Sequence, residues 1–261
     1  MAQQADIHEL YEDAVQAVDG EIEYLVDTFK ALRGREPISF REDFCGTASA
    51  ACEWVGTDPR RTAVGVDIDE GVLEWGRANR VGRLPEVDRA RVKLLHADVT
   101  TVETEPVDVV GAFNFSYYCF KTRDELRAYF RRVHAALNED GLFFLDVFGG
   151  SEAYSVQKEK TKHDDFTYVW DQAEFDPVTH RMVCHIHFKF PDGSKLKKAF
   201  SYEWRMWTMP ELRELLEEAG FAKVRVYWEG EDDDGEANGE FYETETGEPD
   251  PAWVAYIVAE R

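Results

Sequence analysis

The 261-residue sequence is poor in cysteine and in long apolar runs, and each shortage excludes a class of protein. No run approaches the ~20 apolar residues that a membrane-spanning helix needs, and the N-terminus shows no basic and apolar targeting signal. The four cysteines lack the paired spacing of a metal site or a disulfide framework; they are Cys45, Cys52, Cys119 and Cys184. We therefore expect a cytoplasmic protein with reduced thiols, no metal site and no membrane partner.

Positive charge is also scarce, since 30 lysines and arginines stand against 53 aspartates and glutamates and leave a net charge of −23. A nucleic-acid backbone would be repelled at long range unless a basic patch compensated. The basic clusters are small, as at Arg60-Arg61 and Arg131-Arg132, so we expect no nucleic-acid partner. The length suits one large domain, or a core domain with an insertion.

A Gly-x-Gly-x-x-Gly turn, which nicotinamide-dependent oxidoreductases need after their first strand, is absent. The chain has instead the start of a strand at 37–40, a tight turn around Gly46 and a small-residue helix from Ala48. Backbone N–H groups and the positive end of the helix dipole face such a turn. This order of elements predicts a cradle for an anionic or polar ligand.

Three strand-like segments in this half of the chain end in a carboxylate. Glu42 follows the first strand, Asp67 closes the apolar run at 63–66, and Asp98 closes the run at 92–97. A carboxylate at the end of a second strand can accept both hydrogen bonds of a ribose diol. Because parallel strands end at the same edge of a sheet, these acids predict a ligand site along that edge.

These segments resemble the motifs of the class I S-adenosylmethionine-dependent methyltransferases, over 42–48, 66–69 and 97–99. The family's first motif reads acid-x-Gly-x-Gly-x-Gly, and Phe44 and Ala48 stand here where glycines are expected. The resemblance extends from Asp6 to the C-terminus and implies S-adenosylmethionine as the cofactor and S-adenosylhomocysteine as its product. It implies that the cofactor is bound by Tyr11, Glu42, Phe44, Cys45, Gly46, Thr47, Asp67, Ile68, Asp98, Val99 and Asn114.

Roles within that set follow from the same resemblance. Asp67 would hold the ribose hydroxyls, and Asp98 and Val99 would flank the adenine. Gly46 would lie against the amino-acid part of the cofactor, with Glu42 facing its ammonium group.

The resemblance also implies the fold. We expect an α/β structure with a doubly wound, mostly parallel seven-stranded sheet, an antiparallel last strand, and an antiparallel β insertion that caps the site. The expected parts are an N-terminal helical lid at 1–35, a Rossmann-like core at 36–150 and 208–261, and the insertion at 151–207.

Periodicity supplies the detail of individual elements. Apolar residues at helical spacing predict a helix over 6–33, broken near Asp19-Gly20. Thr122 and Glu125 have the spacing of a capping box at the start of a further helix. Gly220 is expected to end the helix that begins at Pro210.

Alternation of apolar and polar residues over 166–175, 181–190 and 196–207 predicts a three-stranded antiparallel meander within the insertion. The segment 229–251 is acidic and rich in glycine, and it is expected to be a long connecting loop. Its acidic run at 231–234 is interpreted as solvated rather than as a cation site.

The methyl acceptor is expected where the fourth strand ends. The segment Asn114-Phe115-Ser116-Tyr117 resembles the Asn-Pro-Pro-Tyr motif of amine and amide methyltransferases without its prolines, which favours N-methylation of a small molecule over O-methylation. Asn114 and Tyr117 are predicted to position the acceptor, and Arg205 to pair with a substrate carboxylate. Aromatic residues of the insertion either wall the acceptor or form the core of the meander; they are Trp170, Tyr202, Trp204 and Trp207.

Two rival functions stay open at this point. The chain could be a non-catalytic S-adenosylmethionine-binding or assembly module. It could also be a nicotinamide-dependent oxidoreductase, although the turn after its first strand lacks the glycine motif of those enzymes. His185 and His187 share one face of a strand, but no carboxylate or cysteine has the spacing to join them as metal ligands. Nothing in the sequence decides whether the chain forms a homodimer.

Overall fold

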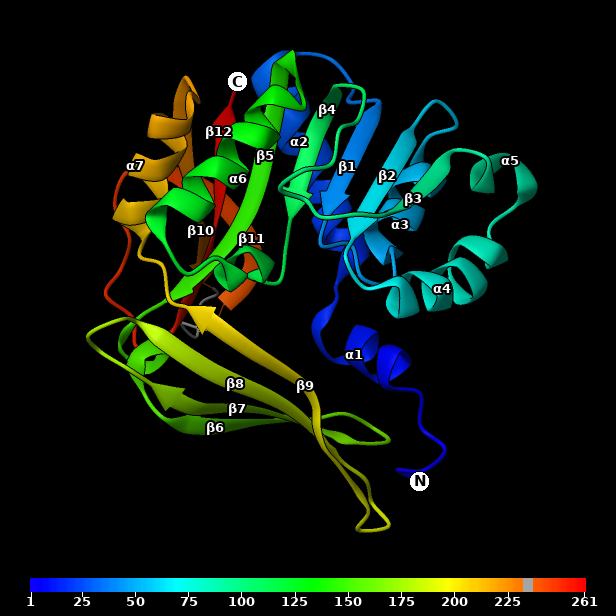
Figure 1. Cartoon of the computed structure of the whole chain (residues 1–261), viewed down its shortest axis with the longest axis vertical. Helices are drawn as coiled ribbons and strands as arrows, with labels where there is room; N and C mark the ends of the chain where they lie inside the picture. Colours follow the sequence, from blue (N-terminus) through cyan, green and yellow to red (C-terminus); the bar gives the residue numbers. More distant parts are fainter. Residues whose placement is uncertain (232–236) are drawn as a thin grey trace.

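A computed structural model describes residues 1–231 and 237–261, and it contains two β-sheets (Figure 1). Within these residues the large sheet has eight strands. Their spatial order is β11 (Ala237–Thr244), β10 (Lys223–Glu231), β12 (Trp253–Glu260), β5 (Leu137–Gly149), β4 (Val107–Ala112), β1 (Ser39–Asp43), β2 (Thr62–Asp67) and β3 (Val92–His96).

The directions of these strands confirm a mostly parallel sheet with an antiparallel last strand. Strands β1 to β5 pair in parallel, and β12 runs antiparallel between β5 and β10. The count differs from the expected seven because β11 forms inside the segment interpreted as a loop. Its Phe241 ring packs on Tyr24 and Tyr256, whereas its neighbours are polar and lie at the edge of the sheet. One half-buried ring in a polar strand leaves too little alternation of apolar and polar residues to detect. Residues 232–234 of the acidic run lie outside the described residues.

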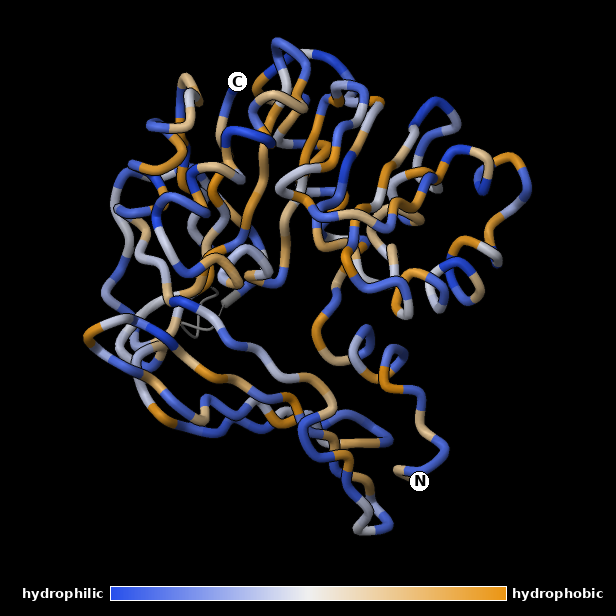
Figure 2. The backbone as a smooth tube through the Cα atoms, in the orientation of Figure 1, coloured by the Kyte–Doolittle hydropathy of each residue, from blue (hydrophilic) through white to orange (hydrophobic). Residues whose placement is uncertain are grey.

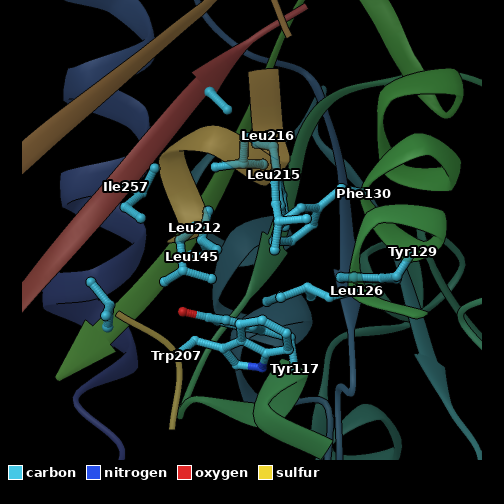
Figure 3. Close-up of a cluster of buried hydrophobic side chains, with 14 of the residues drawn as sticks. Tyr117, Leu126, Tyr129, Phe130, Leu145, Trp207, Leu212, Leu215, Leu216 and Ile257 are labelled. Atoms are coloured by element: carbon cyan, nitrogen blue, oxygen red, sulfur yellow. The ribbon is translucent and has the colours of Figure 1, made fainter. Parts of the chain in front are cut away.

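Helices cover both faces of the large sheet. One face packs against α6 (Arg123–Ala135) and α7 (Met209–Ala219), whose leucines and aromatic rings form the core shown in Figure 3. The other face packs against α2 (Val18–Arg33), α3 (Ser49–Thr57) and α4 (Glu70–Asn79). Figure 2 shows the apolar stretches concentrated along the strands of the large sheet. The short elements are η1 (Val81–Arg83), α5 (Glu86–Arg89), η2 (Ser116–Cys119) and η3 (Ser151–Tyr154).

Local signals placed several helix ends correctly. The Thr122 hydroxyl and the Glu125 carboxylate form the predicted capping box at the start of α6. Gly220 ends α7 in the left-handed conformation, with a φ of 112°. None of the helices among the described residues combines the length and apolar character of a membrane span.

The insertion forms a separate antiparallel sheet of four strands rather than three. It contains β6 (Gln157–Lys162), β7 (Thr167–Phe175), β8 (Arg181–Lys189) and β9 (Lys195–Arg205). Strand β6 was not predicted because its residues are polar and almost all exposed, so its sequence shows no alternation of apolar and polar residues. In Figure 1 this small sheet lies across the end of the large sheet at which β4 and β5 terminate.

The N-terminal helix α1 (Ile7–Val15) lies at the same end of the molecule. It is separated from α2 at Gln16 and Ala17, slightly before the expected break. The Tyr11 ring contacts Phe200 of the small sheet, with centroids 5.0 Å apart. The indole Nε1 of Trp75, from α4, donates to Asp6 at 2.7 Å. Helix α1 is therefore joined to the small sheet on one side and to α4, which covers one face of the large sheet, on the other.

Candidate active site

The turn between β1 and α3 keeps a glycine-like backbone although two of its residues are not glycine. Phe44, Gly46 and Ala48 have φ angles of 60°, 51° and 64°. The left-handed region costs a non-glycine residue roughly 1–2 kcal/mol. Packing compensates, because the Phe44 ring contacts Tyr129 at 5.7 Å between centroids and Ala48 is fully buried. A Cβ placed on Gly46 would meet no atom within 4 Å, so the turn leaves open space at that residue.

Glu42 is the buried acid of this turn. Its side chain is 6% exposed, and its Oε2 atom has no hydrogen-bond partner. Burial, with the nearby charges of Glu21 and Asp67, raises the pKa of Glu42 well above its usual range. The adjacent Asp43 points to the other face, where it pairs with Arg41 at 2.7 Å. Glu42 is therefore a buried carboxyl group that lacks a cation.

The ends of β2 and β3 lie next to this turn, as the parallel pairing requires. Asp67 accepts hydrogen bonds from the backbone N–H of Gly46 at 2.8 Å and of Asp69 at 2.9 Å. The Ile68 side chain beside it is 69% exposed, which leaves an uncovered apolar surface. Asp98 is exposed and caps its own turn by accepting from the N–H of Thr100, whereas Val99 is buried in the core.

Four polar side chains, which we call the Glu12 latch, join α1 to this turn. Glu12 accepts hydrogen bonds from the hydroxyls of Thr47 and Ser49 and forms an ion pair with Arg80 of the α4 C-terminus. The Glu12 side chain is only 8% exposed. Thr47 thus reaches α1 through its side chain, while Cys45 is buried against Gly65. No sequence pattern predicts the Glu12 latch, because Glu12 is one acid among several in a polar helix.

A cavity of about 460 Å³ opens beyond the ends of β4 and β5, between the small sheet, α1 and α2. Most of its wall is aromatic, and it includes Tyr11, Tyr168, Trp170, Tyr202, Trp204 and Tyr256. Of the residues that the structure describes, two carboxylates also line it, Glu21 of α2 and Asp146 of β5, and no lysine, arginine or histidine does. Removal from water raises the pKa of Glu21 to about 8 and that of Asp146 to about 7. We call this space the large cavity.

Strand alternation explains why these acids meet. Phe40, Phe144 and Val258 pack in the core on the α2 side of the sheet. Successive side chains of a strand point to opposite faces, so Glu42 and Asp146, each two residues further along, point to that side as well. Asp146 pairs in register with Tyr256 of β12, and the Tyr256 hydroxyl donates to Glu21 at 3.3 Å.

Asp146 also shapes the backbone at the end of β4. Its carboxylate accepts from the N–H of Asn114 at 2.7 Å and of Phe115 at 2.9 Å. Both of those residues are left-handed, with φ angles of 54° and 57°. Two hydrogen bonds to one carboxylate hold this strained turn, which presents Asn114 and Phe115 to the large cavity.

The two other predicted acceptor residues lie outside the lining of the large cavity. Tyr117 is fully buried, and its hydroxyl donates to the backbone carbonyl of Asp146 at 2.6 Å (Figure 3). Arg205 pairs with Glu211 at 2.9 Å, and its guanidinium lies 3.8 Å from the centroid of the Trp207 ring. Both side chains are thus engaged in structural contacts. Glu21 and Asp146, which do line the large cavity, were not among the predicted site residues.

A second cavity of about 280 Å³ lies next to the first and shares Phe115 and Trp170 with it. It is bounded by the end of β5, the start of β12 and the small sheet. Among the described residues, no three His, Cys, Asp or Glu side chains are grouped so that they could hold a metal ion.

Comparisons with known proteins agree with this geometry. Residues 43–145 match the family model of a methyltransferase domain, and no curated protein matches the chain in sequence. An S-adenosylmethionine-dependent methyltransferase from Clostridium acetobutylicum superposes with a TM-score of 0.71 at 14% identity, over 97% of this chain and 96% of that one. An amino pentose methyltransferase of calicheamicin biosynthesis from Micromonospora echinaspora gives 0.69 at 17% identity, over 98% and 97%.

A sugar N-methyltransferase from Streptoalloteichus has a TM-score of 0.63 at 15% identity, over 98% of this chain and 93% of that one. At such identities the likeness establishes a shared fold. The matched segment, which begins in β1 and ends in β5, defines a methyltransferase domain. The chain thus contains a methyltransferase domain and shares the overall fold of S-adenosylmethionine-dependent methyltransferases.

Proposed function

We propose that this enzyme transfers the methyl group of S-adenosylmethionine to an amino nitrogen of a small molecule held in the large cavity. The observation that carries the proposal is the pair of carboxylates, Glu21 and Asp146, in an aromatic cavity whose described lining has no basic side chain. Aromatic faces and carboxylates attract a cation, whereas an alcohol acceptor would leave both acids without a counter-charge. Structural neighbours that methylate an amino pentose and a sugar nitrogen support this choice over O-methylation.

The residues at the strand ends fit the cofactor. Gly46 leaves room for its amino-acid part, and the unpartnered oxygen of Glu42 suits its ammonium group. Asp67 still has lone pairs for the ribose hydroxyls after binding two backbone N–H groups, and exposed Ile68 offers an apolar surface to the adenine. Asp98 is exposed and would flank the adenine, whereas the Val99 side chain is buried in the core, so that only its backbone would do so. When bound, the cofactor supplies a methyl group already activated by a positively charged sulfur.

The protein's main contribution is then to align the acceptor with that methyl group. Asn114 and Phe115 line the large cavity, on the turn that Asp146 fixes. The rings of Trp170 and Tyr202 would exclude water from the acceptor nitrogen. The second cavity offers room for the part of the acceptor that does not react. Tyr117 and Arg205 would support this wall from behind.

The test is an S-adenosylhomocysteine-release assay over pools of primary amines, amino sugars, amino acids, alcohols and thiols. We expect amines to be turned over and the Gly46→Val variant to be inactive. Asn114→Ala should lower turnover while calorimetry shows unchanged cofactor affinity, since Asn114 faces the acceptor. Turnover of alcohols or thiols with every amine inert would contradict the proposal. Binding of NAD in place of S-adenosylmethionine would contradict the assignment of the cofactor.

A further inference from the structure

We infer that Glu21 is a catalytic residue that accepts the proton of an acceptor arriving as an ammonium ion, while Asp146 has a purely positioning role. This inference rests on the proposed function and specifies which acceptors the enzyme takes. Protonated primary and secondary amines would be substrates at neutral pH, without prior deprotonation in solution.

The contacts of the two acids separate their roles. Both oxygens of Asp146 are occupied by backbone N–H groups, from Asn114 and Phe115, so its carboxylate is tied to the turn. Glu21 receives a hydrogen bond from the Tyr256 hydroxyl at 3.3 Å, and it forms no ion pair with any basic side chain of the described residues. Asp146 is thus held in a fixed position by two backbone N–H groups, whereas Glu21 accepts one longer hydrogen bond and is the freer of the two to take up a proton.

Among the described residues, the surroundings of Glu21 contain no positive charge to compete with such a ligand. The ionisable groups that act on it or line the cavity beside it are all acids or phenols, and the helices and the large sheet supply five of them: Tyr11 of α1, Tyr24 of α2, Glu42 of β1, Asp146 of β5, and Tyr256 of β12. Tyr168 and Tyr202 of the small sheet complete the wall. An ammonium ion would be the only acceptor-side cation in this space, and it would gain from every one of these groups.

The acidity of Glu21 suits proton exchange with an amine. A glutamate with the ordinary pKa of about 4.3 lies some six pKa steps below an alkylammonium of about 10.4, so it leaves almost no neutral amine. Burial and the charge of Asp146 raise the pKa of Glu21 to about 8. That narrows the difference in pKa between the ammonium ion and Glu21 from about six to about two and a half, and it increases the share of neutral amine by roughly a thousandfold or more.

The ammonium proton passes to the Glu21 carboxylate, which leaves a neutral amine with its lone pair. That pair forms the new N–C bond as the S–C bond breaks, and the electrons of the broken bond stay on sulfur. The products are a methylated ammonium ion, S-adenosylhomocysteine and one proton, which leaves Glu21 for solvent when the cavity opens. No oxidant, reductant or metal is required.

The experiment compares Glu21→Gln with Glu23→Gln, a control two residues away on the same helix with an exposed side chain. Tetramethylammonium serves as the probe, because it is always cationic and carries no proton. Calorimetry on the wild type should show binding that strengthens between about pH 6.5 and 8.5 as Glu21 loses its proton. Glu21→Gln should bind about tenfold more weakly and should lose the part of the rise near pH 8, keeping only the part near pH 7 that Asp146 contributes, and Glu23→Gln should match the wild type.

Turnover gives the second readout. With an amine substrate, Glu21→Gln should lower kcat by about 10²–10⁴-fold, as expected for loss of a general base, and S-adenosylhomocysteine affinity should be unchanged. Equal probe binding and equal turnover in the two variants would overturn the role of Glu21 while leaving amine methylation in place. Glu21-dependent probe binding with no amine methylated would instead overturn the proposed function, and this inference with it.

Discussion

The Glu12 latch makes a quantitative prediction about how α1 stays docked over the cofactor turn. In Glu12→Gln the side-chain shape is kept, and the amide oxygen can still accept from Thr47 and Ser49. The ion pair with Arg80 is lost, and the remaining hydrogen bonds become neutral ones. Hydrogen bonds to a charged group are worth about 1.5–3 kcal/mol and neutral ones about 0.5–1.5. Arg80 is 26% exposed and can turn to water, so we expect a net cost of about 2 kcal/mol.

That cost should appear locally, in the docking of α1, rather than in global unfolding. Two kcal/mol corresponds to roughly a 30-fold change in an equilibrium constant. Hydrogen exchange of the α1 amides at pH 7 should therefore be about 30-fold faster in the variant. The amides of α6 should be unaffected. Asp13→Asn, an exposed change on the same helix, serves as the control.

The pH dependence of the same measurement has a definite sign. Burial alone would raise the pKa of Glu12, but Arg80 and the hydroxyls of Ser49 and Thr47 together lower it. A lowered pKa contributes stability above the ordinary value of about 4.3, and this is lost as the pH falls through the lowered value. The wild type and the variant should thus converge in acid. Equal protection of α1 in the two proteins at pH 7 would refute the latch.

Three further substitutions test the cofactor turn. Gly46→Val should abolish S-adenosylmethionine binding in calorimetry and cost about 1–2 kcal/mol of stability, because it places a branched side chain in ligand space at a φ of 51°; normal binding would move the cradle elsewhere. Asp67→Asn should weaken binding by about tenfold or more, since an amide accepts the ribose hydroxyls less strongly; unchanged affinity would refute its role. In urea titrations Ala48→Gly should lie within about 0.5 kcal/mol of wild type because relief of the left-handed strain offsets the lost methyl group. Its control, Ala51→Gly in α3, should cost about 2 kcal/mol; equal costs would contradict the strain argument.

The sheet was predictable because buried parallel strands carry a strong local signal. Strand β4 is buried along its whole length, and β1, β2 and β3 each lead to an acid at the ligand edge. Capping chemistry at Thr122 and Gly220 fixed helix ends without tertiary information. Strands β6 and β11 escaped because they are edge strands, whose polar residues face water and therefore leave no alternation to detect.

The acceptor side was harder to predict for a physical reason. The sequence places Tyr117 next to Asn114, but the left-handed turn at Asn114 and Phe115 directs the following short helix into the core. Glu21 reaches the large cavity only because α2 packs over the ends of β5 and β12. Such a meeting of distant elements leaves no spacing in the sequence. The acid on β5 could have been inferred, since Asp146 interrupts the apolar run at 142–148 of that strand.

The outer strand of the small sheet limits how two copies of this chain could associate. An open strand edge offers unpaired backbone groups to which a second molecule can add its own strand. Strand β6 occupies that edge with the sequence Gln-Lys-Glu-Lys-Thr-Lys, five of whose six side chains are exposed. Three lysines at every second position would have to be brought against the lysines of another copy. Pairing of two copies through the β6 edge is therefore disfavoured, and a homodimer would have to use another surface, such as the opposite edge strand β9.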